Sequence, residues 1–278
     1  MVSEARFGRS SPKNIIITGA TGGIGSALAR VYAGADTTLG LTGRDAVRLR
    51  DVADDCRTRG ATVVAETLDV TNAAALEAFI SDFDSRYPLE LVIANAGVNS
   101  GSTPEAVMEN AADIEEMIAV NLHGCINTVL PAVEAMKSRG RGQIAVMGSL
   151  AALRGLPNCP AYSASKAAVE TFAQGLRGAV AGYGIHISVI SPGYVKSPMT
   201  DRLVGPKPLI MDADKAASII QRGLHRGRAH ISFPLILALG MRLLVLLPTS
   251  IADRIVARFS FTVGPKRDAA DGPKGEVR

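Results

Sequence analysis

Tryptophan is absent from this 278-residue sequence, and aromatic residues make up only 4% of it. Modules that bind single-stranded nucleic acid by base stacking depend on aromatic side chains, so we expect no nucleic-acid partner. Cysteine is also scarce, because the chain holds only Cys56, Cys125 and Cys159. This odd number, without the spacing of metal ligands, favours a protein of the reducing cytoplasm.

Two further features are missing. The four histidines are scattered and form no cluster in the sequence, so no catalytic metal is predicted. The N-terminal stretch from Met1 to Lys13 is polar and holds no apolar core of a leader peptide. We therefore expect no secretory signal.

Charge is unevenly spread along the chain, whose net charge is +4. From Arg226 to the C-terminus there are nine Lys/Arg and four Asp/Glu residues. The first 225 residues hold 21 basic and 22 acidic residues, a net charge of −1. Hydrophobic residues make up 47% of the chain, enough for a sizeable core. The basic C-terminal part fits either ordinary solvated charge or contact with an anionic lipid surface.

Short apolar runs alternate with helical patterns. Strands are predicted at 14–18, 37–42, 61–68, 89–94, 143–147, 185–190 and 230–233. Helices are predicted at 26–35, 45–59, 73–86, 106–130, 130–137, 163–181 and 213–223. This alternation predicts an α/β fold of the Rossmann type, with a doubly wound, mostly parallel seven-stranded sheet and helices on both faces. We expect one catalytic domain over residues 13–233, a helical extension over 234–262 and a disordered tail over 263–278.

The extension is apolar and basic. Leu235 to Leu247 is almost entirely apolar, but as a helix it spans about 20 Å, short of the ~30 Å bilayer core. A transmembrane helix is therefore not expected. Arg254 and Arg258 interrupt the next apolar stretch. Residues 234–259 fit a helix that lies on a membrane surface, a subunit interface, or a flap over the active site, and all three interpretations stay open.

A glycine-rich turn follows the first predicted strand. It reads Thr18-Gly-Ala-Thr-Gly-Gly-Ile-Gly25 and opens the first helix. Glycines let the backbone turn tightly and approach a pyrophosphate, while the helix N-terminus offers free N–H groups to the anion. Between a strand and a helix, this pattern predicts a dinucleotide site.

Tyr162 and Lys166 stand four residues apart in a predicted helix, so their side chains lie on one face. A phenol with its ordinary pKa near ~10 is a poor base at neutral pH, and a neighbouring ammonium lowers that pKa. Tyr162 could then exchange a proton with a carbonyl or alcohol oxygen. Ser149 could bond to the same oxygen.

Taken together and in this order, these motifs resemble the single-domain branch of the short-chain dehydrogenase/reductase family. The glycine spacing is T-G-x-x-x-G-x-G, and Y-x-x-x-K is present. The resemblance implies an enzyme that moves a hydride between a nicotinamide cofactor and a carbonyl or alcohol. It implies four catalytic residues, namely Asn121, Ser149, Tyr162 and Lys166. In that scheme Asn121 holds a water that leads to Lys166, and Lys166 also binds the nicotinamide ribose.

The resemblance also implies the cofactor-binding residues. Asp69 would bond to the adenine, with Val70 packed beside it, and the segment after the sixth strand would meet the nicotinamide. The implied set is Gly19, Thr21, Gly23, Ile24, Gly25, Arg44, Asp69, Val70, Asn95, Gly97, Tyr162, Lys166, Pro192, Gly193, Val195 and Ser197.

The end of the second strand bears on the choice of cofactor. NAD-binding proteins place an acidic residue there for the ribose 2′-OH, whereas this chain has Gly43 followed by Arg44. Arg44 could bind a 2′-phosphate through charge-assisted hydrogen bonds, so NADP(H) is favoured over NAD(H). Gly22 stands where many NADP-binding relatives carry a second basic residue.

The sequence thus predicts an NADP(H)-dependent oxidoreductase for a ketone or aldehyde and the matching alcohol. An apolar lid over Lys196 to Met211 hints at a lipid-like substrate. Loosely, the extension is similar to the branch that holds 11-beta-hydroxysteroid and 3-ketodihydrosphingosine reductases. The alternatives are a sugar epimerase or dehydratase and a non-catalytic NADPH sensor. A homodimer or tetramer is expected, cytoplasmic or peripheral at a membrane.

Overall fold

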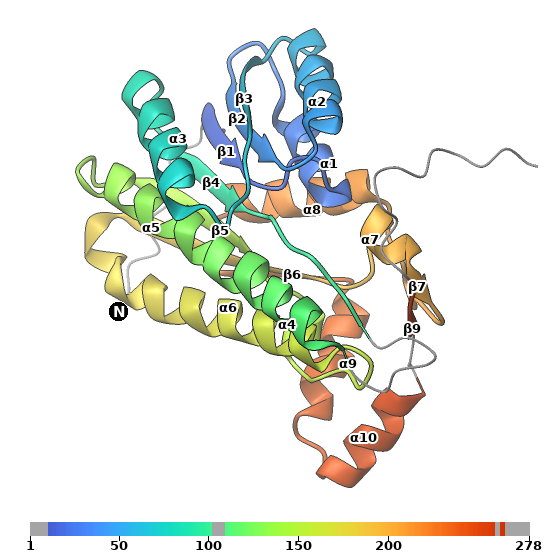
Figure 1. Cartoon of the computed structure of the whole chain (residues 1–278). Helices are drawn as coiled ribbons and strands as arrows, with labels where there is room; N and C mark the ends of the chain where they lie inside the picture. The colour runs from blue at the N-terminus through green and yellow to red at the C-terminus, as the bar shows by residue number, and fades with distance from the viewer. Residues whose placement is uncertain (1–10, 102–108, 259–261, 265–278) are drawn as a thin grey trace, which may run out of the picture.

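A parallel sheet forms the centre of the molecule, seen in a computed structural model that describes residues 11–101, 109–258 and 262–264. Within these residues seven strands pair in the order β3–β2–β1–β4–β5–β6–β8, all parallel (Figure 1). The strands are β1 (Asn14–Ile17), β2 (Thr38–Gly43), β3 (Thr62–Thr67), β4 (Leu91–Ala94), β5 (Gly142–Met147), β6 (Ile185–Pro192) and β8 (His230–Phe233). The predicted doubly wound α/β fold is confirmed.

Helices cover both faces of this sheet (Figure 1). One face carries α1 (Gly23–Tyr32), α2 (Ala46–Thr58) and α8 (Ala213–His225), and the other carries α3 (Ala73–Arg86), α5 (Gly124–Lys137) and α6 (Pro160–Ala179). Ile15 and Ile17 belong to the first core, and Ile16 to the second. Side chains alternate along a strand, so a sheet covered on both sides needs the unbroken apolar run that β1 has.

The long helical segment differs from the prediction. Its residues 106–108 lie outside the described residues, and the helix begins with α4 (Ala111–Met117). A π-helix (Ile118–His123) follows and leads directly into α5, which holds Pro131 in its interior. The predicted break at residue 130 is therefore wrong. Proline removes one backbone hydrogen bond, but the buried face of α5, with Val129 and Ala132, holds the helix on the sheet.

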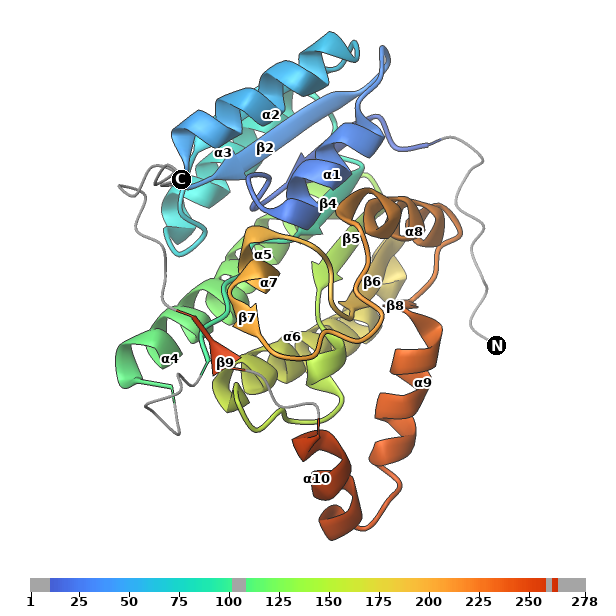
Figure 2. The ribbon, with the colours of Figure 1, turned by 90° about the vertical axis from the view of Figure 1, so that its right-hand side faces the viewer.

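Two helices leave the body of the molecule after β8. These are α9 (Leu235–Leu244) and α10 (Thr249–Ala257), which extend beyond one end of the sheet (Figure 2). The chain then returns, because β9 (Thr262–Val263) pairs antiparallel with β7 (Leu203–Val204), just after the short α7 (Pro198–Asp201). Among the described residues, no helix is both long and apolar enough to cross a membrane.

The C-terminal boundary also needs correction. Val263 is 3% exposed, and the Gly264 N–H donates to the carbonyl oxygen of Arg202 at 2.8 Å. Residues 263 and 264 are thus ordered, contrary to the tail predicted from 263 onward. Backbone pairing with β7 is the physical reason. Residues 265–278 lie outside the described residues.

Candidate active site

The glycine turn joins β1 to α1 at the carboxyl edge of the sheet. Gly19 has a φ of +65°, and a Cβ there would come within 2.7 Å of the Cα of Ala96. Only glycine fits such a position without strain. The α1 N-terminus has no side-chain cap at Gly22 and no acidic residue in its first turn. Its N–H groups and positive dipole end are therefore free for an anion such as a pyrophosphate.

Asn95 fixes this turn from the neighbouring strand. Its amide nitrogen donates to the carbonyl oxygens of Thr18 and Gly19, both at 3.0 Å. Asn95 was predicted to be one of the cofactor-binding residues. The side chain of Asn95 therefore links the end of β4 to the glycine turn between β1 and α1.

Tyr162 and Lys166 lie in the first two turns of α6, which begins at Pro160 rather than at the predicted residue 163. Proline at the first helical position explains the earlier start, because its missing N–H has no partner there in any case. The Nζ of Lys166 donates to the carbonyl oxygen of Met147 at 2.9 Å and lies 5.9 Å from the centre of the Tyr162 ring. The pair thus faces the end of β5, where Ser149 follows.

The protonation of the pair differs from the expectation. Burial raises the pKa of Tyr162 to about 12, although a hydrogen bond with Ser149 works in the opposite direction. Burial also lowers the pKa of Lys166 to about 8. The four-residue spacing predicted that Lys166 lowers the pKa of Tyr162. Burial is instead the largest cause of the shift in both groups, because desolvation disfavours the charged form of each.

Asn121 lies in the π-helix and is 1% exposed. Its Oδ1 accepts from the Val98 N–H at 2.8 Å, while its Nδ2 donates to the Val98 carbonyl at 3.0 Å and to the Ser165 hydroxyl at 2.9 Å. Such π-helical turns are often found at functional sites. Asn121 therefore joins the loop after β4 to α6. A Cβ at Gly97 would lie 3.2 Å from both the Oδ1 of Asn121 and the Nζ of Lys166.

The two serines inside the Y-x-x-x-K motif both make hydrogen bonds. The Ser165 hydroxyl donates to the carbonyl oxygen of Tyr162 at 2.8 Å. The Ser163 hydroxyl accepts from the Leu156 N–H at 3.1 Å. A buried hydroxyl needs such partners, so these serines hold the loop before α6 and the backbone of Tyr162 in place.

The far end of the site carries several charges. The Arg44 side chain is 54% exposed, and its NH1 lies 3.4 Å from the Oε1 of Glu116 and 3.8 Å from the Oδ2 of Asp69. The other oxygen of Asp69 accepts from the backbone and hydroxyl of Thr71, at 2.9 and 2.8 Å. Glu116 was missed by the sequence analysis. It comes from α4, and no motif links α4 to the end of β2.

The segment after β6 closes the site from the other side. The Gly193 N–H donates to the carbonyl oxygen of Phe233 at 2.7 Å, and Ser197 caps α7 in a reciprocal capping box with Thr200. A Cβ on Gly23 would lie 2.6 Å from the Cβ of Ser197. The glycine turn at Gly23 and the segment at Ser197 are therefore in close contact, although they are 174 positions apart in the sequence.

All the predicted site residues except Asn121 line one cavity of about 1780 Å³. Asn121 lies behind this surface. Other lining residues were missed, among them Tyr194, Leu156 and Met241. Tyr194 could have been found, because it stands between the predicted Gly193 and Val195. Residues from the lid and from both C-terminal helices complete an apolar wall, among them Leu209, Leu244 and Ile255. Residues of both C-terminal helices thus lie at this cavity.

Three comparisons place the chain among known proteins. The family model of the short chain dehydrogenases matches residues 13–207. An uncharacterized oxidoreductase of Myxococcus xanthus is 35% identical over 89% of this chain and 98% of its own length. The 11-beta-hydroxysteroid dehydrogenase 1A of Arabidopsis thaliana is 31% identical over 80% of this chain and 68% of its own.

The solved structures include a short chain dehydrogenase/reductase of Burkholderia phymatum in complex with NAD. It superposes with a TM-score of 0.77 at 23% identity, over 86% of this chain and 95% of that chain. This likeness shows the fold. Within the described residues no cluster of possible metal ligands is found. The chain belongs to the short-chain dehydrogenase/reductase family and is an oxidoreductase that uses a nicotinamide cofactor.

Proposed function

We propose that this protein reduces an apolar ketone or aldehyde to the alcohol with NADPH, and that Tyr162 is the acid. The observation that carries the proposal is that Ser149, Tyr162 and Lys166 meet at one cavity. The same cavity is lined by the glycine turn at one end and by apolar helices at the other. A nicotinamide bound there would supply the hydride.

The residues present fit a dinucleotide. The left-handed Gly19 and the uncapped N-terminus of α1 leave backbone N–H groups for the pyrophosphate. The Ser149 and Tyr162 hydroxyls would both bond to the substrate oxygen and stabilise the charge that develops on it. Tyr162 would pass its proton to that oxygen, and Lys166 would replace it.

The protonation states suit the proposed proton transfer to a carbonyl oxygen. A phenol whose pKa is raised to about 12 stays protonated at neutral pH, which is the form that gives a proton to a carbonyl oxygen. Oxidation of an alcohol would need the phenolate instead. Lys166, with a pKa of about 8, is mostly an ammonium at pH 7 and can supply the replacement proton.

The test is turnover of NADPH and NADH by the purified protein with ketones of increasing size, alongside Tyr162→Phe. We expect turnover of apolar ketones, and a loss of at least about 100-fold in kcat for Tyr162→Phe without a change in melting temperature. Cofactor binding without turnover of any carbonyl would contradict the proposal and favour the NADPH sensor. An unchanged kcat in Tyr162→Phe would exclude Tyr162 as the acid.

The preference for NADPH rests on Arg44, which follows Gly43 at the end of β2 and lines the cavity. Its two carboxylate neighbours, at 3.4 and 3.8 Å, are partly exposed, so a dianionic 2′-phosphate can compete for the guanidinium. We expect Arg44→Ala to raise KM for NADPH about 10- to 100-fold, as for the loss of a charged hydrogen bond. KM for NADH should hardly change. An equal effect on both cofactors would argue against this role.

Peripheral membrane contact is proposed for residues 234–259. Leu235, Ile236 and Leu246 are between 75% and 79% exposed, and Arg254 and Arg258 are exposed nearby. Exposed apolar side chains with neighbouring arginines suit an anionic lipid surface. Co-sedimentation with phosphatidylserine vesicles, weakened by Ile236→Glu with Leu246→Glu, is the expected result. Equal recovery with and without vesicles would contradict it.

A homodimer or tetramer is proposed through the helices that carry Asn121 and Tyr162. Leu130 on α5 is 50% exposed, which supports an apolar contact on this side. Light scattering after gel filtration measures the mass, and a monomer at micromolar concentration would refute the proposal.

The three cysteines are free and buried. Because such thiols persist where the medium is reducing, they support a cytoplasmic location.

A further inference from the structure

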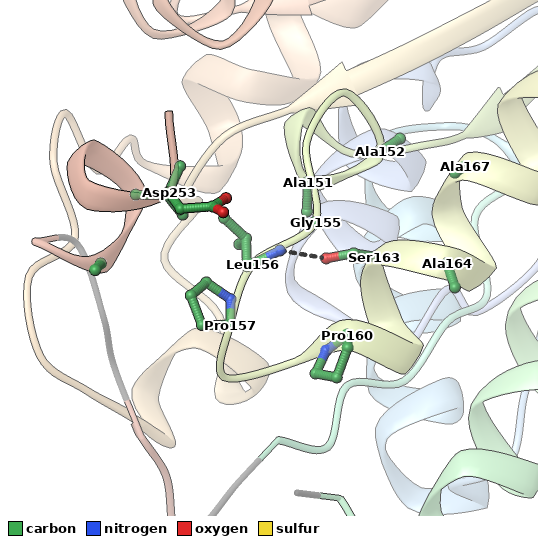
Figure 3. Close-up of a pocket in the computed structure, with 12 residues that line it drawn as sticks. Ala151, Ala152, Gly155, Leu156, Pro157, Pro160, Ser163, Ala164, Ala167 and Asp253 are labelled. Carbon is green, nitrogen blue, oxygen red and sulfur yellow. Dashed lines mark hydrogen bonds between the residues drawn. The ribbon is translucent and has the colours of Figure 1, made fainter. Parts of the chain in front are cut away.

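A second cavity of about 660 Å³ lies next to the active site (Figure 3). Its walls are the short helical turn after Ser149 (residues 150–152), the loop that leads to Pro160, the first turns of α6, and α10. Small apolar residues dominate its lining, namely Ala151, Ala152, Gly155, Ala164, Ala167 and Ala257. We call this cavity the α10 groove.

The polar groups in the α10 groove already have partners. Asp253 forms an ion pair with Arg154. The Ser163 hydroxyl accepts from the Leu156 N–H, the bond drawn in Figure 3. The described walls therefore offer a ligand mainly methyl and methylene groups. Such a lining favours an apolar ligand, since a polar one would lose its hydrogen bonds to water without replacing them.

The α10 groove adjoins the catalytic cavity directly. Ala151, Leu156 and Val256 line both cavities. The hydroxyl of Ser149 accepts from the N–H of Ala151 at 3.1 Å. The wall that the two cavities share at Ala151 therefore lies two residues from Ser149, whose hydroxyl is proposed to bond to the substrate oxygen. Leu156 and Tyr162 both pack against the small cluster of Cys159, Leu203 and Val263. The α10 groove and the catalytic cavity therefore share a wall at Ala151, Leu156 and Val256.

We propose that the α10 groove holds the apolar tail of the substrate, an unbranched alkyl chain attached to the reacting carbonyl. This rests on the proposed reductase function and specifies its substrate class. A tail that passes between the side chains of Leu156 and Val256 must be slim, which favours an aliphatic chain over a fused ring system. The volume falls within the range of ~300–1,000 Å³ that ligand pockets have, so it can hold much more than a methyl group.

The test is a series of 2-ketones from four to fourteen carbons with saturating NADPH. We expect kcat/KM to rise by up to about fourfold for each methylene that is buried, and then to level off. Absence of turnover at every chain length would mean that the proposed function has failed. Turnover without any dependence on chain length would leave that function standing and overturn the assignment of the α10 groove.

Variants that fill the α10 groove test whether the tail binds there or on another apolar surface of the protein. Ala164→Phe places a ring in it from α6, and Gln174→Phe places the same ring at an exposed position of α6 outside it. The ratio of kcat/KM for the long ketone to that for the short one should fall toward one in Ala164→Phe. It should keep its wild-type value in Gln174→Phe.

Ala152→Leu, from the opposite wall, serves as a second variant if Ala164→Phe melts at a lower temperature than the wild type. A wild-type ratio in both groove variants would show that the tail lies elsewhere and would refute the proposal.

Discussion

At Gly23 the glycine turn and the segment around Ser197 come so close that a single added methyl group can test their contact. A Cβ at Gly23 would lie 2.6 Å from the Cβ of Ser197, whereas at the adjacent Gly22 it would meet only the Gly19 carbonyl oxygen, at 3.4 Å. Carbon atoms prefer separations of about 3.5–4.0 Å. Gly23→Ala therefore forces the segment around Ser197 outward by roughly 1 Å.

The expected magnitude follows from that displacement. A misplacement of about 1 Å near the chemistry can lower the rate about 100-fold, so kcat/KM should fall by 10- to 100-fold, with weaker NADPH binding. The free energy of unfolding should fall by roughly 0–2 kcal/mol. Alanine favours the first turn of α1 by up to ~1 kcal/mol over glycine, while overpacking destabilises by about 1–3 kcal/mol.

The chain has no tryptophan, so the fluorescence of bound NADPH can be titrated without an indole background. Gly22→Ala is the matched control, because residue 22 has an ordinary φ of −78° and room for a methyl group. Its NADPH affinity should stay within about threefold of wild type, the effect of an N-cap change below ~1 kcal/mol. If Gly23→Ala binds and turns over like Gly22→Ala, the contact between the phosphate turn and the Ser197 segment does not position the cofactor.

Two further predictions concern pH and stability. Because burial lowers the pKa of Lys166 to about 8, its ammonium is lost as pH rises through that value, and kcat for reduction should fall on the alkaline side. A kcat that stays flat to pH 10 would contradict this proton supply. Asp84 and Arg139 form two hydrogen bonds at 2.6 and 2.9 Å, and their side chains are only 17% and 26% exposed. Asp84→Asn should lower the free energy of unfolding by about 1–3 kcal/mol in urea titrations, whereas Asp54→Asn in the exposed pair with Arg57 should change it by less than ~1 kcal/mol.

The regular elements were predictable because their sequences carry the matching period. The predicted limits of α3 and β8 agree with the structure. The segment from 111 to 137 was not predictable in the same way. Pro131 indicates a break by local rules, but packing of α5 on the sheet outweighs the lost hydrogen bond. Local propensity gave way there to tertiary contacts.

The electrostatics of the site were the least predictable part. The four-residue spacing of Tyr162 and Lys166 indicated an ammonium that lowers the pKa of the phenol, but depth of burial decides both values. Glu116 reaches Arg44 from another helix, and no spacing in the sequence shows it. The hydrogen bonds of two serines are hidden in the same way. Ser165 accepts from Asn121, which is distant in the sequence, and Ser163 accepts from Leu156 in the preceding loop.

The sequence by itself determined the family, the sheet and the residues around the phosphate turn and Tyr162, because these depend on local geometry: a left-handed glycine, an uncapped helix start, two side chains one turn apart. Only the tertiary structure decided where the C-terminal extension lies. Its apolar pattern suits a membrane, a partner or a cavity wall equally well, since burying apolar surface is favourable whatever covers it. In the folded chain, residues of α9 and α10 such as Leu244 and Ile255 line the active-site cavity, a position that depends on contacts distant in the sequence.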